Sequence, residues 1–240
     1  MILFSTDPIL IAAAVIPAVA LLIYVYREDR LEAESPRLLA SLVFYGILST
    51  VIAIVLEDVF GFLLELFVPE DQVLYWAILV FFIVGPAEEG AKYALLRWKT
   101  WRNPAFNCRF DGVVYAVFVS LGFALWENVG YVAMYGFGTA LLRAVTAVPG
   151  HACFGVFMGT WYGLAKRLDT EGRRAGAKLC RILAFAVPTV LHGTYDFIAA
   201  IEIEGLEWLF AAFIAVLFAV SWLTVRGLSR RDRFFRSFYR

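Results

Sequence analysis

Two adjacent glutamates and a lysine interrupt an apolar stretch in the first half of the chain. The stretch begins at Val73 and reads VLYWAILVFFIVG, and Glu88, Glu89 and Lys92 follow it closely. An ionised side chain at the depth of a bilayer core costs at least ~2.5 kcal/mol, so such groups face a protein interior or a water-filled pocket and usually mark function. Glu88 and Lys92 are four residues apart and share one helical face. Neighbouring residues point about 100° apart on a helix, so we expect that the two glutamates cannot both face one point.

Polar side chains also interrupt two later apolar stretches. Glu127 lies at the end of the run FVSLGFALWEN, with Asn128 beside it. His151 follows a proline and a glycine, and Arg143 precedes it by about two helical turns. A carboxylate and an imidazole in these places could act as a general base or acid. The alternatives are a helix end at the outer interface for Glu127 and a hydrogen-bonded core residue for His151.

A third pair of polar residues occurs near the end of the sixth apolar stretch. His192 and Asp196, in the sequence LHGTYD, are four residues apart and therefore occupy one helical face. The aspartate could orient the imidazole or share a ligand with it. His192 and His151 are the only two histidines in the chain.

Together these side chains offer acids, bases and hydrogen-bond donors for hydrolysis without a serine or cysteine nucleophile. The chain contains no GxSxG, HExxH or GxGD-type motif. Cys153 lies two residues after His151 and is the alternative nucleophile, but a cysteine among apolar residues is more often inert packing.

The rival chemistry uses a metal ion. Two histidines with a glutamate and an aspartate are suitable zinc ligands, and one glutamate would remain as the base. These alternative ligands are Glu127, His151, His192 and Asp196. We commit to no metal or other cofactor from the sequence and keep zinc as the alternative.

The composition indicates an integral membrane protein. Of the 240 residues, 62% are hydrophobic, which exceeds the apolar share of ordinary soluble domains. The mean hydropathy of the chain is +0.75. Three scattered cysteines without a CxxC motif imply neither a disulfide framework nor a thiolate zinc site. The first apolar run has no basic segment before it and no small-residue cleavage signature, so we expect a retained span and not a signal peptide.

Seven stretches have the length of about 20 mostly apolar residues that a membrane span needs. They cover residues 8–26, 38–56, 73–96, 112–134, 142–165, 180–200 and 206–225. Nearly all lysines and arginines fall in alternate breaks between them, which the positive-inside rule places in the cytoplasm. We therefore expect an all-α bundle of about seven transmembrane helices, with the N-terminus outside and the C-terminus cytoplasmic. It should form a single integral-membrane domain over 1–240, with a catalytic core over about 73–200.

Two shorter segments lie outside these spans. Residues 59–68 (VFGFLLELFV) are too few to cross a bilayer, and we expect them to lie along the outer interface. The C-terminal tail RRDRFFRSFYR mixes arginine with aromatic residues, which suits either a leaflet of anionic lipid or a solubilising tail.

The polar motifs resemble those of a known family. Glu88-Glu89-x-x-Lys92, Phe123-x-x-x-Glu127 and His192-x-x-x-Asp196, with Arg143 and His151 between them, resemble the PrsW family of intramembrane proteases. Its wider superfamily includes the type II CAAX prenyl endopeptidases and bacteriocin-processing proteins. The resemblance runs from about Val73 to Asp196. It implies a glutamate-dependent endopeptidase embedded in the membrane.

The resemblance also implies a substrate and a cellular location. In bacteria, PrsW-like enzymes make the first cut in a single-span anti-sigma factor, on its extracytoplasmic side. We expect such a single-span membrane protein and the lipid bilayer as partners, no nucleic acid, and a multi-pass protein of a prokaryotic cytoplasmic membrane. The CAAX relatives carry histidine in place of Glu127 and asparagine in place of Asp196, so we do not expect prenylated substrates.

As a hypothesis for the mechanism, Glu88 or Glu89, helped by Glu127, deprotonates a water that attacks the scissile carbonyl. His192 and Asp196 then stabilise the oxyanion or protonate the leaving amine. His151 belongs to the same catalytic set, and Lys92, Arg143 and Asn128 support the structure or the substrate.

Other classes of membrane protein carry acids and histidines at mid-membrane. A transporter would typically show repeated halves or paired broken helices, and we detect neither. A seven-span rhodopsin needs a lysine in its last span, and the stretch LEWLFAAFIAVLFAVSWLTV has none. A non-catalytic scaffold stays open as an alternative.

One expectation about depth conflicts with a shared site. The predicted topology places four of the candidate site residues in the outer halves of their spans: Glu127, His151, His192 and Asp196. Glu88, however, follows the outer start of its span by about 20 Å at 1.5 Å per residue. A tilt of the helix, a break at Gly85-Pro86 or a late start of the third span must close this gap.

Overall fold

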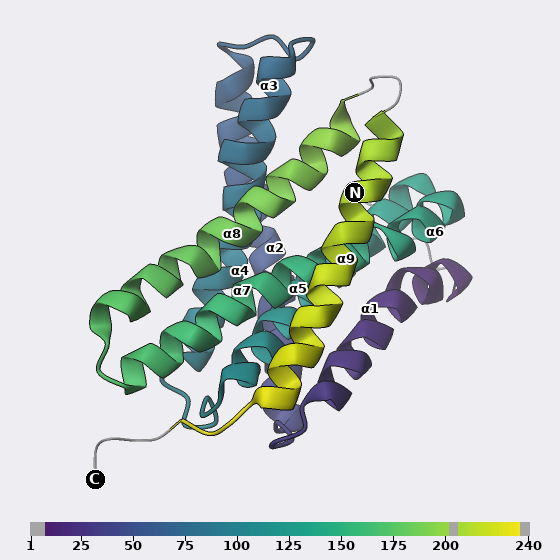
Figure 1. The fold of residues 1–240 in the computed structure, drawn as a ribbon. Coiled ribbons are helices and arrows are strands. Elements are labelled where there is room, and N and C mark those ends of the chain that lie inside the picture. The colour runs from purple at the N-terminus through teal and green to yellow at the C-terminus, as the bar shows by residue number, and fades with distance from the viewer. Residues whose placement is uncertain (1–7, 202–205, 236–240) are drawn as a thin grey trace.

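The computed structural model describes residues 8–201 and 206–235 (Figure 1). Helices form nearly all of this part of the chain, and within it no strand is present apart from one isolated bridge between Cys108 and Phe234. In chain order the elements are α1 (Pro8–Glu28), α2 (Pro36–Glu65), α3 (Val73–Ile78), the π-helix η1 (Leu79–Val84), α4 (Gly85–Thr100), α5 (Arg109–Tyr135), α6 (Phe137–Val145), α7 (Ala147–Thr170), α8 (Arg174–Ala200) and α9 (Leu206–Arg231).

The prediction of an all-α bundle with seven spans is confirmed. Within the described residues, seven helices are long and apolar enough to cross a membrane, and each contains one of the predicted stretches. The fifth span is broken at Thr146, where α6 ends and α7 begins. The predicted interfacial segment at 59–68 is wrong, because residues 59–65 continue α2 without interruption. No proline interrupts them, and a continued helix satisfies the backbone groups that lipid cannot.

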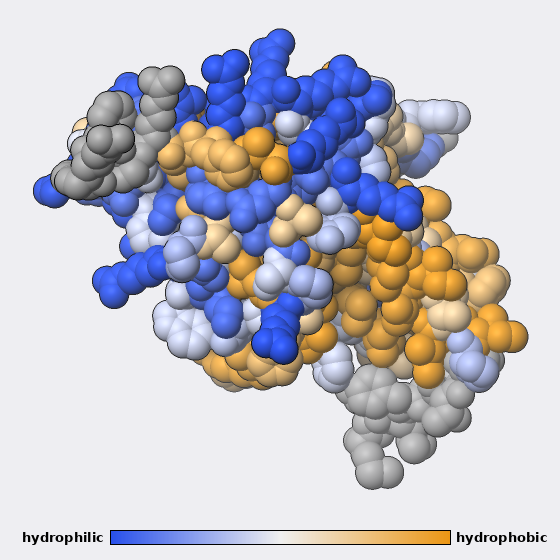
Figure 2. Space-filling view, turned by 90° about the horizontal axis from the view of Figure 1, so that it is seen from below, coloured by the Kyte–Doolittle hydropathy of each residue, from blue (hydrophilic) through white to orange (hydrophobic). Residues whose placement is uncertain are grey.

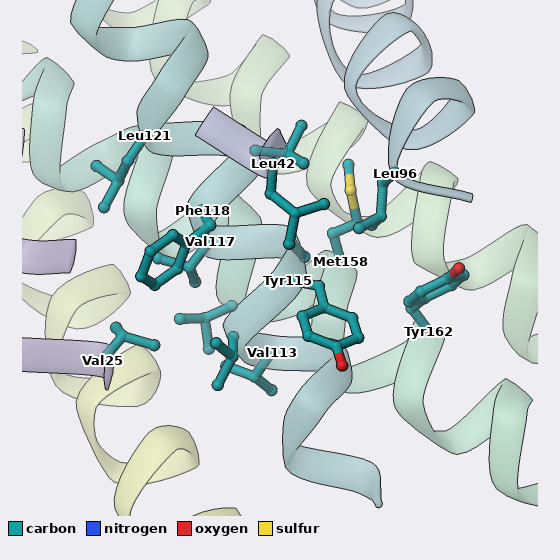
Figure 3. Close-up of a cluster of buried hydrophobic side chains, with 14 of the residues drawn as sticks. Val25, Leu42, Leu96, Val113, Tyr115, Val117, Phe118, Leu121, Met158 and Tyr162 are labelled. Carbon is teal, nitrogen blue, oxygen red and sulfur yellow. The ribbon is translucent and has the colours of Figure 1, made fainter. Parts of the chain in front are cut away.

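Helix α5 forms the centre of the bundle. In its most apolar window 78% of the residues are buried, whereas the figure is 17% for both α1 and α9, which lie at the periphery. Its apolar residues occur all around the helix, which is the pattern of a helix enclosed by others. It packs against α1, α2 and α7, and the cluster in Figure 3 joins Val113, Tyr115 and Val117 of α5 to Leu42 of α2 and Met158 of α7.

Basic residues gather at one end of the bundle. The α1–α2 link, the end of α4, the α7–α8 turn and the end of α9 all meet there, at the bottom of Figure 1. Figure 2 views this end, and hydrophilic residues cover much of it. The side that this end faces, and hence the orientation of the termini, stays a prediction. The last five residues of the arginine- and aromatic-rich tail lie outside the described residues.

Glycines allow α5 and α7 to approach at backbone distance. A Cβ added at Gly159 of α7 would lie 2.4 Å from the carbonyl oxygen of Gly112 and 2.4 Å from the Cα of Val113, both in α5. Such contacts between small residues are a main source of helix association in membranes, where no hydrophobic effect drives helices together. Because α5 carries Glu127 and α7 carries His151, this contact sets how close the two residues can lie.

We predict that Gly159→Ala destabilises the protein, because the new methyl group forces α5 and α7 apart. Overpacking of this kind costs about 1–3 kcal/mol, so the melting temperature should fall by several degrees. The measurement is thermal unfolding of the detergent-solubilised protein. Gly130→Ala is the matched control: Gly130 also lies in a helix, but a Cβ there meets nothing within 4 Å. Equal melting temperatures for the two variants would contradict this packing.

Candidate active site

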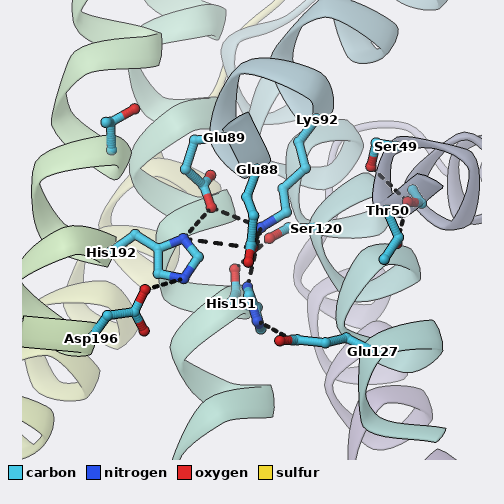
Figure 4. Close-up of polar contacts among 12 residues, drawn as sticks. Ser49, Thr50, Glu88, Glu89, Lys92, Ser120, Glu127, His151, His192 and Asp196 are labelled. Carbon is cyan, nitrogen blue, oxygen red and sulfur yellow. Dashed lines mark hydrogen bonds and ion pairs between the residues drawn. The ribbon is translucent and has the colours of Figure 1, made fainter. Parts of the chain in front are cut away.

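The first part of the site is an ion triplet within α4. Glu88, Glu89 and Lys92 are 6%, 0% and 0% exposed. The Lys92 ammonium donates to Glu88 Oε2 at 3.1 Å and to Glu89 Oε1 at 2.8 Å, and it lies 3.9 Å from the centre of the Phe123 ring (Figure 4). Lys92 is therefore not a residue that extends toward the lipid headgroups. The expectation that the two glutamates cannot face one point is also wrong, because their flexible side chains converge on one ammonium.

The chain just before these residues is a π-helix, which brings α8 against α4. The π-helix η1 ends at Val84, and α4 begins with Gly85-Pro86. The helix from Val73 to Thr100 continues through this point, so a π-helical turn takes the place of the expected break. A Cβ added at Gly85 would lie 3.1 Å from the carbonyl oxygen of Thr189, and one at Gly193 would lie 2.7 Å from the Phe81 ring. The two glycines therefore permit a close contact that puts His192 beside Glu89. Single π-helical turns often occur at functional sites.

His192 lies among three carboxylates, two beside its Nδ1 and one beside its Nε2. Its Nδ1 is 3.0 Å from Glu89 Oε1 and 3.8 Å from Glu88 Oε2, and its Nε2 is 3.4 Å from Asp196 Oδ2. The predicted sharing of one helical face by His192 and Asp196 is therefore observed as a direct contact. Ionised carboxylates only accept hydrogen bonds, so a ring protonated on both nitrogens suits this position. The ring also stacks on Phe154 with the centroids 4.7 Å apart.

His151 joins the ion triplet to a second carboxylate. Its Nδ1 is 3.2 Å from the Lys92 ammonium, and its Nε2 is 2.8 Å from Glu127 Oε2. An ammonium has donors only, so Nδ1 accepts and the ring proton lies on Nε2, facing Glu127. The Ser120 hydroxyl donates to the backbone oxygen of His151 at 2.6 Å, which ties α5 to α7 at this level.

An arginine from α6 binds the same oxygen of Glu127 that His151 contacts. Arg143 donates from Nη2 to Glu127 Oε2 at 2.9 Å and from Nε to Asn128 Oδ1 at 3.0 Å. The Asn128 amide donates in turn to the backbone oxygen of Ala14 in α1 at 2.8 Å. Asn128 is thus a structural link between helices, and Arg143 neutralises the charge of Glu127.

One cavity connects these groups. It has a volume of about 390 Å³, and its polar walls come from α2, α4, α5, α6, α7 and α8. These polar lining residues are Glu57, Glu88, Glu127, Arg143, His151, His192 and Asp196. Glu89 is not among them, because it is fully buried between Lys92 and His192. Cys153 does not line the cavity and packs with Phe154 and Leu217 instead.

The sequence did not single out several lining residues. Glu57 directly follows the predicted span over 38–56, which would place it in a loop. It lies in α2 instead, and its buried Oε1 has no hydrogen-bond partner among the described residues. The sequence does contain a signal for this position, because the apolar runs before and after Glu57 are also compatible with one longer helix through it. The aromatic residues Trp76, Tyr131 and Tyr195 also line the cavity, and nothing in their spacing distinguishes them from other membrane aromatics.

The conflict over depth is resolved by the shape of the bundle. The α2–α3 hairpin extends beyond the neighbouring ends of α8 and α9 in Figure 1, so the third span begins beyond the level at which the sixth span ends and the seventh begins. The π-helix also has a shorter rise per residue than an α-helix. Glu88 therefore reaches the level of His192 and Asp196.

Comparison with known proteins identifies the family. Residues 34–225 match the model of a family described as PrsW family intramembrane metalloprotease. The chain belongs to the PrsW family. It is 30% identical over 224 residues to Protease PrsW of Halalkalibacterium halodurans, covering 93% of this chain and 99% of that protein. Identity is 34% over 189 residues to Protease PrsW of Geobacillus kaustophilus, covering 79% of each chain. No solved structure matches the chain.

Membership of the PrsW family confirms four predictions from the sequence. The family resemblance is correct, the protein is a peptidase, its activity is intramembrane proteolysis, and its location is the cell membrane as a multi-pass protein. Protease PrsW of Bacillus subtilis, 32% identical over 190 residues, covers 79% of this chain and supports the same assignment. The family favours a protease over the alternatives of a transporter or a scaffold.

The family description implies a metal ion, and the donor atoms fit one. Glu88, Glu89, His151 and His192 each offer one ligand atom within 4.8 Å of the others. Carboxylate oxygens and imidazole nitrogens are typical zinc ligands. The sequence suggested Glu127 and Asp196 as ligands as well. In the structure Glu127 contacts the Nε2 of His151 and Asp196 contacts the Nε2 of His192, on the side of each ring away from Glu88 and Glu89. That is where carboxylates that orient metal-binding histidines are usually found.

We predict that Lys92→Met strongly destabilises the PrsW protein, because it leaves two buried carboxylates without a cation. Removing one partner of a buried ion pair costs about 3–5 kcal/mol. The combined variant Glu88→Gln/Glu89→Gln/Lys92→Met removes the whole triplet and should recover most of the lost stability. Thermal unfolding in detergent measures both effects. A triple variant less stable than Lys92→Met would contradict the description of Lys92 as the counter-ion of both glutamates.

Proposed function

We propose that this PrsW protein cleaves a single-span membrane protein of the anti-sigma-factor class, with Glu88 as the base that activates water. The observation that carries this proposal is the difference between the two glutamates. Glu88 lines the cavity, whereas Glu89 is fully buried between Lys92 and His192. A general base must reach both water and substrate, and only Glu88 of the two has that access.

The reaction begins when Glu88 takes a proton from water and the oxygen attacks the scissile carbonyl carbon. The oxyanion that forms accepts from the Nε2–H of His192, whose contact with Asp196 is the longer one at 3.4 Å, while Nδ1–H stays on Glu89. Glu88 then gives its proton to the leaving nitrogen as the carbon–nitrogen bond breaks. The products are a carboxylic acid and an amine, and Glu88 is again ionised.

The remaining residues position these groups. Glu89 holds the Lys92 ammonium and the Nδ1 of His192, so it fixes two partners of the base at once. Glu127 orients His151, which contacts the same ammonium from the other side. Should a divalent ion bind, Glu88, Glu89, His151 and His192 would hold it, and it would supply Lewis-acid polarisation of the carbonyl. The ion would compete with Lys92 for the carboxylate oxygens of both glutamates.

Features of the cavity support a membrane-anchored substrate. The cavity lies among helices that span the bilayer, and its apolar lining includes Trp76, Tyr195 and Ala199. A volume of about 390 Å³ is in the range of small-ligand pockets, so it accommodates a short unfolded segment and not a folded domain. The extracytoplasmic position of the cut follows from the predicted topology.

We predict that purified protein in liposomes cleaves a single-span reporter and that Glu88→Gln lowers the rate by about 10²–10⁴-fold, the usual contribution of a general base. His192→Gln should also lower the rate, through loss of the charged donor to the oxyanion. Cys153→Ala is the matched control, since Cys153 is close in sequence to His151 but lies outside the cavity, and its rate should equal that of the wild type. Gel analysis of the two fragments measures each rate.

Full activity of Glu88→Gln would contradict the role of this residue, and loss of activity in Cys153→Ala alone would favour a thiol nucleophile. The same assay after exhaustive chelation separates the two forms of the mechanism. Activity that persists supports water activation by glutamate alone. Activity that disappears and returns on addition of zinc supports a metal held by the donors described above.

A further inference from the structure

A second large cavity lies far from the catalytic groups, at the basic end of the bundle. It has a volume of about 880 Å³ and lies where α5 begins and where α7 and α9 end. Figure 2 faces this end of the molecule. Its charged lining residues are Arg109, Arg167, Glu171, Arg173, Arg230, Arg231, Asp232 and Arg233.

The two acids of this cavity do not neutralise its arginines. Glu171 is bound to Arg167 at 2.7 Å and lies 3.6 Å from Arg173, and the hydrogen bond from Arg167 lowers the pKa of Glu171. The Asp232 carboxylate accepts the backbone N–H groups of Arg109 and Phe110 at 3.1 and 3.2 Å, which caps the start of α5. Among the described residues, the arginines at the end of α9 therefore face the cavity without an acidic partner, and the lining has an excess of four positive charges.

One guanidinium donor in the cavity is buried and unpaired. The Nε–H of Arg109 is inaccessible to solvent and has no hydrogen-bond acceptor among the described residues. A buried donor without a partner costs about 1–3 kcal/mol, and more when it belongs to a charged group. Folded proteins rarely leave such a group unsatisfied, so an acceptor from outside the protein is expected here.

We propose that this cavity binds a phosphate group and thereby links the ends of α5, α7 and α9. Guanidinium groups match the geometry of phosphate oxygens and bind them through paired hydrogen bonds. An anion would reduce the repulsion among the arginines, and a rotation of the Arg109 side chain, which lines the cavity, would bring its Nε–H to the anion. Because α5 carries Glu127 and α7 carries His151, the bound phosphate would stabilise two of the helices that form the catalytic cavity.

The phosphate could belong to a lipid headgroup or to a soluble phosphate. The cavity lies at the ends of spanning helices, where lipid headgroups are found, and Phe234 beside it is 53% exposed. The basic end is also the one that the sequence predicts to face the cytoplasmic leaflet, which is rich in anionic lipid. A lipid headgroup and a soluble phosphate could therefore both reach the arginines of this cavity.

The test compares two variants that lose the same charge at the same end of the molecule. Arg109→Gln/Arg231→Gln changes the cavity, and Arg27→Gln/Arg37→Gln changes two exposed arginines of α1 and α2 away from it. Native mass spectrometry in detergent counts molecules of phosphatidylglycerol retained by each protein, with phosphatidylcholine as the uncharged comparison. Thermal unfolding with inorganic pyrophosphate tests the soluble source.

We expect the wild type and the control variant to retain phosphatidylglycerol or to be stabilised by pyrophosphate, and the cavity variant to bind the same probe at least tenfold more weakly. A response to the lipid alone identifies a headgroup site, and a response to pyrophosphate identifies a soluble ligand. Absence of binding to both probes, or equal weakening in the two variants, would overturn the proposal. If Arg109→Gln/Arg231→Gln does not fold, Arg230→Gln/Arg231→Gln replaces it, because both residues line the cavity, and unchanged binding in that variant would equally overturn the proposal.

Discussion

The buried ammonium of Lys92 is the interaction on which the site depends. It contacts Glu88, Glu89 and His151 within 3.2 Å and has no exposure to solvent. Two carboxylates so close together repel one another in a low-dielectric interior, and the shared cation offsets this repulsion. The histidines then extend this arrangement outward, to Glu127 on one side and to Asp196 on the other.

This ion cluster explains why the surrounding helices pack so closely. Glycines at the contacts of α4 with α8 and of α5 with α7 bring the backbones together, because longer side chains would keep His192 away from Glu89 and His151 away from Glu127. The π-helix before α4 and the long α2–α3 hairpin adjust the depth of Glu88. Close packing therefore serves the chemistry of the cavity and not only the stability of the bundle.

Much of this arrangement could be predicted from the sequence. The parts that could not be predicted were missed for one common physical reason. Hydropathy identified the seven spans, and spacing of four residues identified the pairs Glu88–Lys92 and His192–Asp196. Contacts between helices depend on rotation and side-chain packing, which periodicity does not specify. For that reason the position of Glu57 in the cavity was missed. The contact of His151 with Lys92 was missed for the same reason.

The central claim is that charged groups from different helices stabilise one another around a single cavity. The most direct measurement is a double-mutant cycle on unfolding free energy with Glu89→Gln and His192→Gln, whose side chains meet at 3.0 Å although they are 103 residues apart in sequence. Residues in direct contact show coupling energies of about 0.5–3 kcal/mol, and a buried charged pair should lie in the upper half of that range. Additive effects of the two substitutions, within about 0.5 kcal/mol, would contradict the account.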